Sequence, residues 1–469
     1  MPDLKVRKVL SNVNDGFTET LKFKVLHCGN VEGNNNKFYC LEIQKNAKGE
    51  YRLFSHYGRL GKTNIYEVRD TYEGQKVKDQ TIAEDEFEVI IKKKLKGKKI
   101  KDEDTGEERI EKYVEVETIK PNVGSENICN KTITTVTSTA KVAKVDTAGF
   151  DKEVARIINQ IVEENIHNIK TMTTFTLSAG GFETPLGPVT QQHIEKAKQP
   201  LNSMKVLLKN GKLDTANKTV IECNNAYFSM IPHPFGHKIL ETDWISDEAK
   251  LATEFDLLDQ LSTAVTMGSS LNQGSKQQLN ALGTDVEVLK DDRKYEQLER
   301  YVEDSKAQNH THLKKYQVQN IFSVRIPNER SRYEKVVSKY GNIKELFHGS
   351  RNCNVLSILK SGLIIPPCNA PGVTGRMFGS GIYFAHNSTK SLNYSLGNWL
   401  GTRNKYNNTF LIIANAAMGK TFECTSSMSS GVPSGYNSIH AKKGMSLQND
   451  EYIVAELSQA TITYLIELK

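Results

Sequence analysis

The spacing of the apolar residues changes twice along this chain of 469 residues. Near the N-terminus they follow strand patterns, at Phe17–Val25, Lys37–Gln44 and Tyr51–His56. From Phe150 to Ile169 they recur every three or four residues, as one face of a helix requires. From residue 320 onward short strand patterns return, together with one helix pattern at 354–360. The strand patterns are Asn320–Ile326, Glu345–His348, Gly381–Ala385, Thr409–Ala416, Tyr452–Ala455 and Thr463–Leu468. Segments with such different periods are expected to form separate cores, which predicts a multi-domain α+β protein.

Length and composition agree with this division and argue against two classes of protein. At roughly 150 residues per domain, the chain has room for about three domains. The longest apolar run, Phe410–Met418, is about half of what a membrane span needs. The first residues, MPDLKVRKVL, lack the apolar region of a signal peptide. We therefore expect a protein that is neither secreted nor bound to a membrane.

The cysteines and the net charge constrain the function of the protein only weakly. The seven cysteines are scattered and form no CxxC pair, which favours free thiols and predicts no metal site. The net charge of +7 is modest. A lysine-rich run at Lys92–Lys101 is followed at once by acidic residues. This run fits a solvated helix end, a patch that contacts DNA or a nuclear import signal.

Turn-forming and capping residues set the expected boundaries. Ser246 is a favourable N-cap for a helix that Gly268 can end. The stretch 122–147 is rich in Thr, Ser, Asn and Lys without a period, and residues 269–290 are polar. We therefore expect a first domain at 1–120, a linker at 121–147, a helical domain at 148–268, a second linker at 269–290 and a third domain at 291–469.

Four motifs in the last segment carry residue types that can perform chemistry. In chain order they are His348-Gly-Ser-Arg, Gly379-Ser-Gly-Ile-Tyr-Phe-Ala, Ser388-Thr-Lys-Ser-Leu-Asn-Tyr and Asn449-Asp-Glu-Tyr-Ile-Val. Each motif alone is more typical of a turn, a core strand or a surface. No GxGxxG follows a strand and no Walker GKT occurs, so a nucleotide would not be bound as in dinucleotide-binding or P-loop folds.

Together, the four motifs resemble the catalytic domain of poly(ADP-ribose) polymerases, whose His–Tyr–Glu triad lies in HGS, GIYFA and NEYIV contexts. The resemblance implies a mixed-sheet ADP-ribosyltransferase domain that uses NAD⁺ as co-substrate and releases nicotinamide. It implies His348, Tyr383 and Glu451 as the catalytic residues.

The expected reaction explains these residue types. Loss of nicotinamide leaves positive charge on the ribose C1′, as in glycoside cleavage. A carboxylate, here Glu451 by resemblance, stabilises that charge and can act as a base toward the acceptor hydroxyl. A glutamate at this place is the family's feature for building polymers. His348 is implied to hydrogen-bond a ribose hydroxyl, and Tyr383 and Tyr394 to sandwich the nicotinamide ring.

Further positions near the substrate follow from the same resemblance. The positions implied to contact NAD⁺ besides the triad are Gly349, Ser350, Asn354, Lys390, Ser391 and Tyr394. Within this set, the Gly349 backbone and the Ser391 hydroxyl would hold the carboxamide. Met377 matches an acceptor-site residue, and Pro366–Phe378 resembles the loop over the donor site.

Two positions depart from the family pattern. Ile364 stands where an arginine near the adenosine end is usual, in the context GLRIAPP. Arg376 replaces a tyrosine of the TGYMFG context. These departures bear on the affinity for NAD⁺ and on loop contacts.

The middle segment resembles the helical regulatory domain of DNA-dependent family members, which hinders entry of NAD⁺ until DNA binds. The matching stretches are Pro185-Leu-Gly, Tyr227-Phe-Ser-Met-Ile-Pro-His-Pro-Phe-Gly and Phe255-Asp-Leu-Leu-Asp. The structural alternative is that the prolines only end helices and that Phe235 belongs to the core.

The first segment resembles a WGR domain, which binds DNA ends in the family, at Asn35–Tyr39 and Tyr57–Lys62. Tyr57 stands in for the signature tryptophan and still offers a ring for stacking. Arg59 and Lys62 would contact phosphates. The alternative is a hairpin turn with solvated charges.

The predicted function is therefore poly(ADP-ribosyl)ation stimulated by DNA breaks, in the response to DNA damage and DNA repair. The expected partners are broken DNA and protein acceptors of ADP-ribose. The expected location is the nucleus in a eukaryote and the cytoplasm otherwise. Two alternatives remain, a mono-ADP-ribosyltransferase with the same triad and a catalytically silent scaffold that binds DNA ends.

Overall fold

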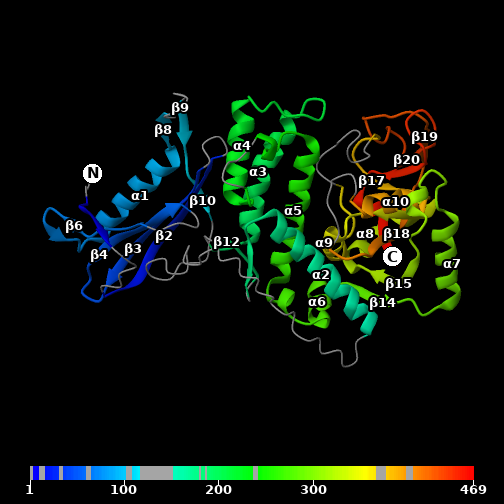
Figure 1. Cartoon of the computed structure of the whole chain (residues 1–469), viewed down its shortest axis with the longest axis horizontal. Coiled ribbons are helices and arrows are strands. Elements are labelled where there is room, and N and C mark those ends of the chain that lie inside the picture. Colours follow the sequence, from blue (N-terminus) through cyan, green and yellow to red (C-terminus); the bar gives the residue numbers. More distant parts are fainter. Residues whose placement is uncertain are drawn as a thin grey trace. The chain divides into compact units, whose positions relative to one another are not determined.

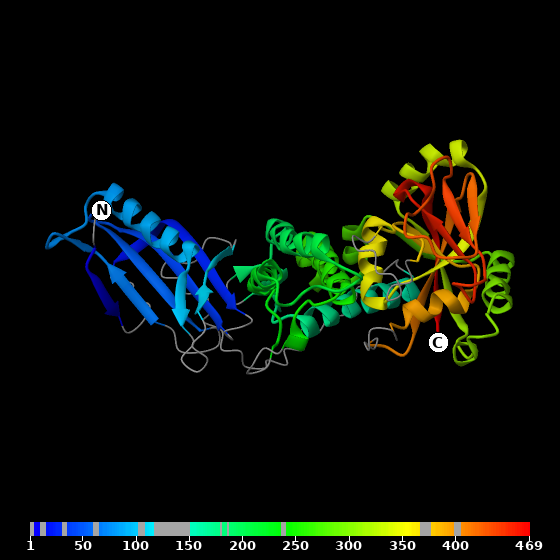
Figure 2. The ribbon, with the colours of Figure 1, turned by 90° about the horizontal axis from the view of Figure 1, so that it is seen from above.

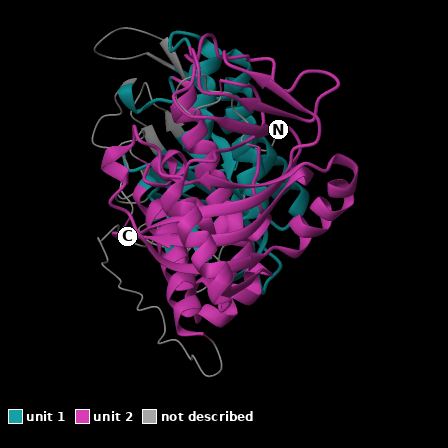
Figure 3. Ribbon diagram, turned by 90° about the vertical axis from the view of Figure 1, so that its right-hand side faces the viewer, with its two compact units in different colours: residues 1–139, 172–207, 214–246 teal, residues 140–171, 208–213, 247–469 magenta. Residues whose placement is uncertain are grey.

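The computed structural model describes residues 4–9, 16–30, 35–59, 65–101, 108–116, 151–178, 181–184, 187–235, 241–365, 377–397 and 405–469. The chain divides into two compact units (Figure 3). Unit 1 comprises Met1–Thr139, Met172–Leu207 and Asp214–Ser246, and unit 2 comprises Ala140–Thr171, Leu208–Leu213 and Asp247–Lys469. The helical segment expected at 148–268 is thus shared between the two units.

Unit 1 contains a six-stranded antiparallel sheet with the strand order β1-β5-β4-β3-β2-β10. Its strands are β1 (Val6–Val9), β2 (Phe17–Asn30), β3 (Asn35–Asn46), β4 (Tyr51–Arg59), β5 (Ile65–Arg69) and β10 (Val114–Val116). The three strands predicted from the sequence are confirmed as parts of β2, β3 and β4. Each observed strand is longer than its prediction, because pairing with a neighbour extends it beyond the apolar residues.

Helix α1 (Gln80–Lys96) lies along one face of this sheet (Figures 1 and 2). It begins at Asp79, whose carboxylate accepts a hydrogen bond from the Thr81 amide at 2.9 Å. Its buried Phe87 and Ile91 belong to one apolar cluster with residues of β2, β3 and β4. The short strands that complete this part are β6 (Thr71–Tyr72), β7 (Gln75–Lys76), β8 (Lys98–Lys101) and β9 (Glu108–Glu111).

The rest of unit 1 is mainly helical. It contains α3 (Gln191–Leu207), α4 (Lys218–Met230) and a small sheet of β11 (Thr176–Ser178), β12 (Gly181–Thr184) and β13 (Gly187–Pro188). Helices α3 and α4 pack against each other, and both carry fully buried side chains, among them Leu201 of α3 and Tyr227 of α4. Helix α4 also contacts strand β2, where a ring nitrogen of His27 lies 2.5 Å from the Ser229 carbonyl oxygen.

Unit 2 begins with two long helices, α2 (Lys152–Met172) and α5 (Glu248–Met267). The apolar stripe predicted for the first of them is buried, including Ile157, Ile161 and Ile169. The predicted N-cap of α5 was wrong by one residue. Asp247, not Ser246, caps the helix, because its carboxylate accepts the Lys250 amide at 2.9 Å.

The segment 269–290, expected to be a linker, is regular structure. It contains α6 (Ser275–Leu282) and β14 (Asp285–Val288). Three well-separated apolar residues anchor it in the core, Leu271, Leu282 and Val286. The polar composition of this segment concealed them, because so few buried side chains leave no readable period.

The remainder of unit 2 contains two sheets joined by a bridge between Phe347 and Ala385. The five-stranded sheet has the order β14-β15-β22-β18-β16, with β15 (Val318–Arg325), β16 (Ile343–Gly349), β18 (Thr409–Ala417) and β22 (Ala460–Leu468). The four-stranded sheet has the order β17-β21-β20-β19, with β17 (Ile382–Phe384), β19 (Thr421–Cys424), β20 (Ser438–Ala441) and β21 (Glu451–Val454).

Four helices accompany these sheets, α7 (Asp292–Asp304), α8 (Pro327–Tyr340), α9 (Asn352–Ser361) and α10 (Ser388–Ser395) (Figure 1). All six strands predicted for this segment are present, and the predicted helix at 354–360 is part of α9. Strands β14, β19 and β20 were not predicted. Helices and sheets therefore mix as the α+β prediction requires. Within the described stretches, no helix is long and apolar enough to cross a membrane.

Candidate active site

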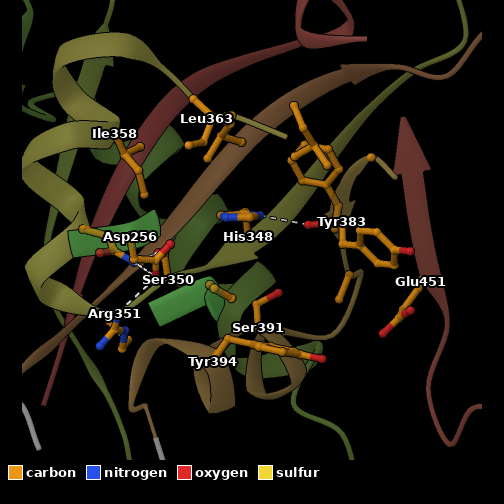
Figure 4. Close-up of a pocket in the computed structure, with 18 of the residues that line it drawn as sticks. Asp256, His348, Ser350, Arg351, Ile358, Leu363, Tyr383, Ser391, Tyr394 and Glu451 are labelled. Carbon is orange, nitrogen blue, oxygen red and sulfur yellow. Dashed lines mark hydrogen bonds and ion pairs between the residues drawn. The ribbon is translucent and has the colours of Figure 1, made fainter. Parts of the chain in front are cut away.

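A cavity of about 250 Å³ lies in unit 2, where β16, β17 and β21 bring their ends together with α5, α9 and α10 (Figure 4). Every residue of the predicted triad and every other predicted NAD⁺ contact lines it: His348, Gly349, Ser350, Asn354, Tyr383, Lys390, Ser391, Tyr394 and Glu451. The fold thus gathers into one cavity residues that are spread over more than a hundred positions of sequence.

His348 is held in a single orientation. It is the penultimate residue of β16, and its Nδ1 lies 2.8 Å from the carbonyl oxygen of Tyr383, as the dashed line in Figure 4 marks. A carbonyl can only accept, so Nδ1 carries the hydrogen. Burial lowers the pKa of His348 below its ordinary value, which favours the neutral ring. The other nitrogen, Nε2, is then a hydrogen-bond acceptor.

Backbone contacts fix the ring of Tyr383. Its hydroxyl donates to the Gly379 carbonyl at 2.7 Å and accepts from the Phe378 amide at 3.1 Å. The second tyrosine, Tyr394, comes from α10, and burial raises its pKa, so its hydroxyl stays protonated. The two predicted sandwich residues therefore come from different elements and line the same cavity.

Strand β16 and helix α10 meet at Gly349 more closely than a side chain would permit. A Cβ atom at this position would lie 1.7 Å from the carbonyl oxygen of Ser391. The Ser391 hydroxyl donates to the Phe347 carbonyl at 3.1 Å and holds the two elements together. Glycine is therefore required here by the space available.

Glu451 and Lys390 form a buried ion pair at the side of the cavity formed by β21. Lys390 Nζ lies 2.8 Å from Glu451 Oε1, and their side chains are 11% and 5% exposed. Lys390 also donates to the Asn449 carbonyl at 2.7 Å. Burial raises the pKa of the Glu451 carboxyl, and the Lys390 ammonium partly offsets that shift. Glu451 Oε2 is buried and has no hydrogen-bond partner within the described residues.

Helix α5 supplies one wall of the cavity, and the four motifs did not predict this wall. Its lining residues are Ala249, Ala252, Thr253, Asp256 and Asp259. Asp256 Oδ2 lies 2.9 Å from a guanidinium nitrogen of Arg351 and accepts from Asn354 Nδ2 at 3.2 Å. Both residues lie in stretches that resemble the family, Arg351 in His348-Gly-Ser-Arg and Asp256 in Phe255-Asp-Leu-Leu-Asp, but nothing in the sequence pairs them.

Comparison with known proteins accounts for this arrangement of elements. Three family models match, the WGR domain at residues 23–105, the poly(ADP-ribose) polymerase regulatory domain at 149–289 and the poly(ADP-ribose) polymerase catalytic domain at 292–430. The chain belongs to the poly(ADP-ribose) polymerase family. The match confirms the three-part architecture of WGR, helical regulatory and catalytic domains.

Named relatives show the same relationship at low identity. Poly [ADP-ribose] polymerase 2 of Arabidopsis thaliana is 26% identical over 95% of this chain and 72% of its own length. Poly [ADP-ribose] polymerase of Sarcophaga peregrina is 32% identical over 55% of this chain, which spans 25% of that protein. Protein mono-ADP-ribosyltransferase PARP3 of Homo sapiens is 24% identical over 88% of this chain and 75% of its own length.

Some of the residues predicted from the family pattern lie outside the cavity. Met377 does not line it and instead packs at the edge of an apolar cluster with Phe378 and Ile453. Tyr57 lies in β4 of unit 1, where its ring stacks on Tyr39 at 5.4 Å and its hydroxyl donates to Glu67 at 2.8 Å.

Other predictions fall outside what the structure describes. They concern Lys62, the side chain of Arg59, Arg376 and most of the loop resembling a cover over the donor site, at 366–376. Among the residues that are described, no three His, Cys, Asp or Glu side chains are arranged to hold a metal ion.

Proposed function

We propose that this member of the family is a poly(ADP-ribose) polymerase stimulated by DNA breaks, which transfers ADP-ribose from NAD⁺ to proteins and to growing chains. The observation that carries the proposal is the Glu451 carboxylate, fixed by Lys390 through one oxygen and facing the cavity that His348 and Tyr383 also line. A polymerase needs a fixed anion at that place, because positive charge develops on the ribose during transfer.

The residues of the cavity fit NAD⁺ as substrate. Gly349 presents backbone without a side chain, and Ser391 lines the same cavity with its hydroxyl, and the two together suit a planar carboxamide. Tyr383 and Tyr394 supply aromatic faces for the nicotinamide ring, whose positive charge an aromatic face attracts. His348 Nε2, an acceptor in the neutral ring, suits a ribose hydroxyl donor.

In the proposed reaction, the bond between ribose C1′ and the nicotinamide nitrogen breaks, and its electron pair leaves with nicotinamide. Glu451 stabilises the charge on C1′ and accepts the proton of the acceptor hydroxyl as its oxygen bonds to C1′. Lys390 keeps Glu451 ionised until that proton arrives, because a neighbouring ammonium favours the charged carboxylate.

DNA is the proposed regulator. Tyr57, Arg59 and Lys62 would contact a DNA end from the first domain, by ring stacking and phosphate contacts. Helix α5 lines the cavity through Asp256 and its neighbours, so it competes for space with a long substrate. DNA can activate only if it binds better to a state in which this helix is displaced or loosened. Breaks in nuclear DNA are the corresponding proposed setting.

Incubation with labelled NAD⁺, with and without nicked DNA, tests the proposal directly. Nicotinamide release and products of many units, both increased by DNA, are expected. The relative named as a mono-ADP-ribosyltransferase supports a second candidate, which would release nicotinamide but yield only single-unit products. Absence of nicotinamide release under both conditions would rule out both candidates.

A further inference from the structure

Glu329, in the first turn of α8, is a buried carboxylate that joins two distant segments. Only 1% of the surface of Glu329 is exposed to solvent. One oxygen, Oε1, accepts from the Leu363 amide at 3.2 Å, and Oε2 accepts from the Ile462 amide at 2.8 Å and the Thr461 hydroxyl at 3.3 Å. A carboxylate in such a place is costly unless donors surround it, so these three donors define its position.

On one side Glu329 is fixed to the central sheet. The paired register of β15 and β22 ends at Ser323 and Tyr464, so the Ile462 amide lies beyond it and donates to Glu329. Strand β22 is also paired with β18 along the same stretch. Glu329 is thereby tied to one of the central strands of unit 2.

On the other side Glu329 holds the chain as it leaves α9. A Cβ atom at Gly362 would lie 2.4 Å from Glu329 Oε1, so the carboxylate packs directly against that backbone. One turn along α8, a guanidinium nitrogen of Arg332 donates to the Ser361 carbonyl at 3.2 Å. We call Glu329 and Arg332 the α8 clamp. It grips three consecutive residues, from Ser361 to Leu363.

The gripped segment leads into one wall of the cavity. Leu363 and Ile364 line it, together with Ile358 of α9. In Figure 4 Leu363 and Ile358 lie on one side of His348, and Glu451 lies on the other. This wall is therefore away from the ion pair of Lys390 and Glu451. Neither Glu329 nor Arg332 lines the cavity, so both act only through the backbone that they hold.

We infer that the α8 clamp positions the wall that receives the ADP-ribose part of NAD⁺, an inference that rests on the proposed function. An apolar wall attracts a ligand by dispersion, which falls steeply when a gap opens. Ile364 carries no charge that could act over a longer distance. The affinity at this wall therefore depends on where the backbone at Leu363 lies, and Glu329 sets that position.

Substitution of each clamp residue, with a matched control on the same helix, tests the inference. Glu329→Gln replaces one acceptor oxygen by an NH₂ group, which only donates. The glutamine side chain then has a single acceptor oxygen and cannot accept from both backbone amides. Arg332→Ala removes the surface contact to Ser361. The controls are Glu334→Gln and Arg330→Ala, which form a solvent-exposed ion pair with each other on α8.

The full-length protein, saturated with nicked DNA, is used for steady-state kinetics, and calorimetry gives the affinities for ADP-ribose and for benzamide. We expect KM for NAD⁺ to rise about tenfold in Glu329→Gln and about threefold in Arg332→Ala, the range for one lost hydrogen bond. ADP-ribose affinity should fall by the same factors. The kcat and the affinity for benzamide, a nicotinamide analogue, should stay unchanged, as should all values of both controls.

Two results would overturn the inference in an active protein. One is an unchanged KM in Arg332→Ala together with an unchanged KM in a folded Glu329→Gln. The other is an equal loss of benzamide and ADP-ribose affinity, which indicates general distortion. If circular dichroism shows Glu329→Gln to be unfolded, Arg332→Ala decides alone. A wild-type protein that consumes no NAD⁺ would instead refute the proposed function.

Discussion

Lys390 and Glu451 are partners in a buried ion pair, with Nζ and Oε1 2.8 Å apart. The ammonium is fixed from a second side by the Asn449 carbonyl, two residues before Glu451 in the chain. Lys390 therefore cannot follow a movement of the carboxylate without losing that bond. The pair fixes one carboxylate oxygen and leaves Oε2 without a partner among the residues described.

Glu451→Gln should lower polymer elongation by orders of magnitude. The amide keeps the size of the carboxylate but removes the charge that stabilises the transition state. Product sizing on a gel checks the result, and slow single-unit transfer or NAD⁺ hydrolysis can persist. Glu456→Gln, an exposed glutamate just beyond β21, is the control and should elongate normally. Elongation by Glu451→Gln at the wild-type rate would contradict the assigned role.

As the pH is lowered, kcat/KM should fall, and the midpoint of this fall should lie above pH 4.5, the ordinary pKa of a glutamate. Burial raises the pKa of Glu451 from that ordinary value, and protonation as the pH falls removes the charge. Lys390→Met removes the ammonium that favours the ionised carboxylate, so it should shift this midpoint to higher pH. The profile of NAD⁺ hydrolysis gives both midpoints. A midpoint that stays in place, or moves to lower pH, would contradict the coupling of the two residues.

Binding to nicked DNA should weaken steeply between about 50 and 200 mM salt, since phosphate contacts release counterions. Tyr57→Ala should weaken it further, by roughly 1–3 kcal/mol, the contribution of ring stacking to one base. Tyr57→Phe keeps the ring on Tyr39 and loses only the bond to Glu67, so it should bind almost as the wild type does. Fluorescence anisotropy measures all three, and equal affinities for the alanine variant and the wild type would exclude stacking.

Leu258→Ser in α5 should raise the activity measured without DNA. Leu258 is fully buried, and its loss should destabilise the packed helix by about 2–5 kcal/mol. A loosened helix α5 would open the wall that Asp256 and its neighbours form. Nicotinamide release in the absence of DNA measures the effect, and Thr266→Ala, exposed on the same helix, is the control.

Leu261→Ser should act in the same direction, since Leu261 is buried to the same degree. Hydrogen exchange should show α5 losing protection when DNA is added. If both leucine variants remain folded by circular dichroism and stay inactive without DNA, the helix is a passive spacer.

The sequence predicted the elements with a strong period and missed those with few buried residues. Strand β18 and helix α2 were predictable because nearly every position on their buried faces is apolar. Strand β14 and helix α6 were not, since Leu282 and Val286 bury too little to produce a pattern. The N-cap of α5 was ambiguous because Ser246 and Asp247 are adjacent and both are favourable caps.

For the site, too, the sequence predicted some residues and missed those whose role depends on contacts between distant segments. The motifs named the triad and the other predicted NAD⁺ contacts that line the cavity, because their order and context resemble a known family. They could not predict that Asp256 reaches Arg351, since that contact depends on how α5 packs against α9. The role of Glu329 could not be predicted from the sequence either. A glutamate in the first turn of a helix is ordinarily exposed to solvent and is stabilised there by the helix dipole.

The contact between Gly349 and the Ser391 carbonyl limits how this protein can escape an inhibitor. A compound that hydrogen-bonds to the backbone at Gly349 meets a surface that no single substitution there can reshape, because any added Cβ would overlap Ser391. Resistance would have to arise at side chains farther from that carbonyl, such as Ile364 or Ala252. Compounds confined to the glycine side of the cavity should therefore select for resistant variants less readily than compounds that extend toward α5.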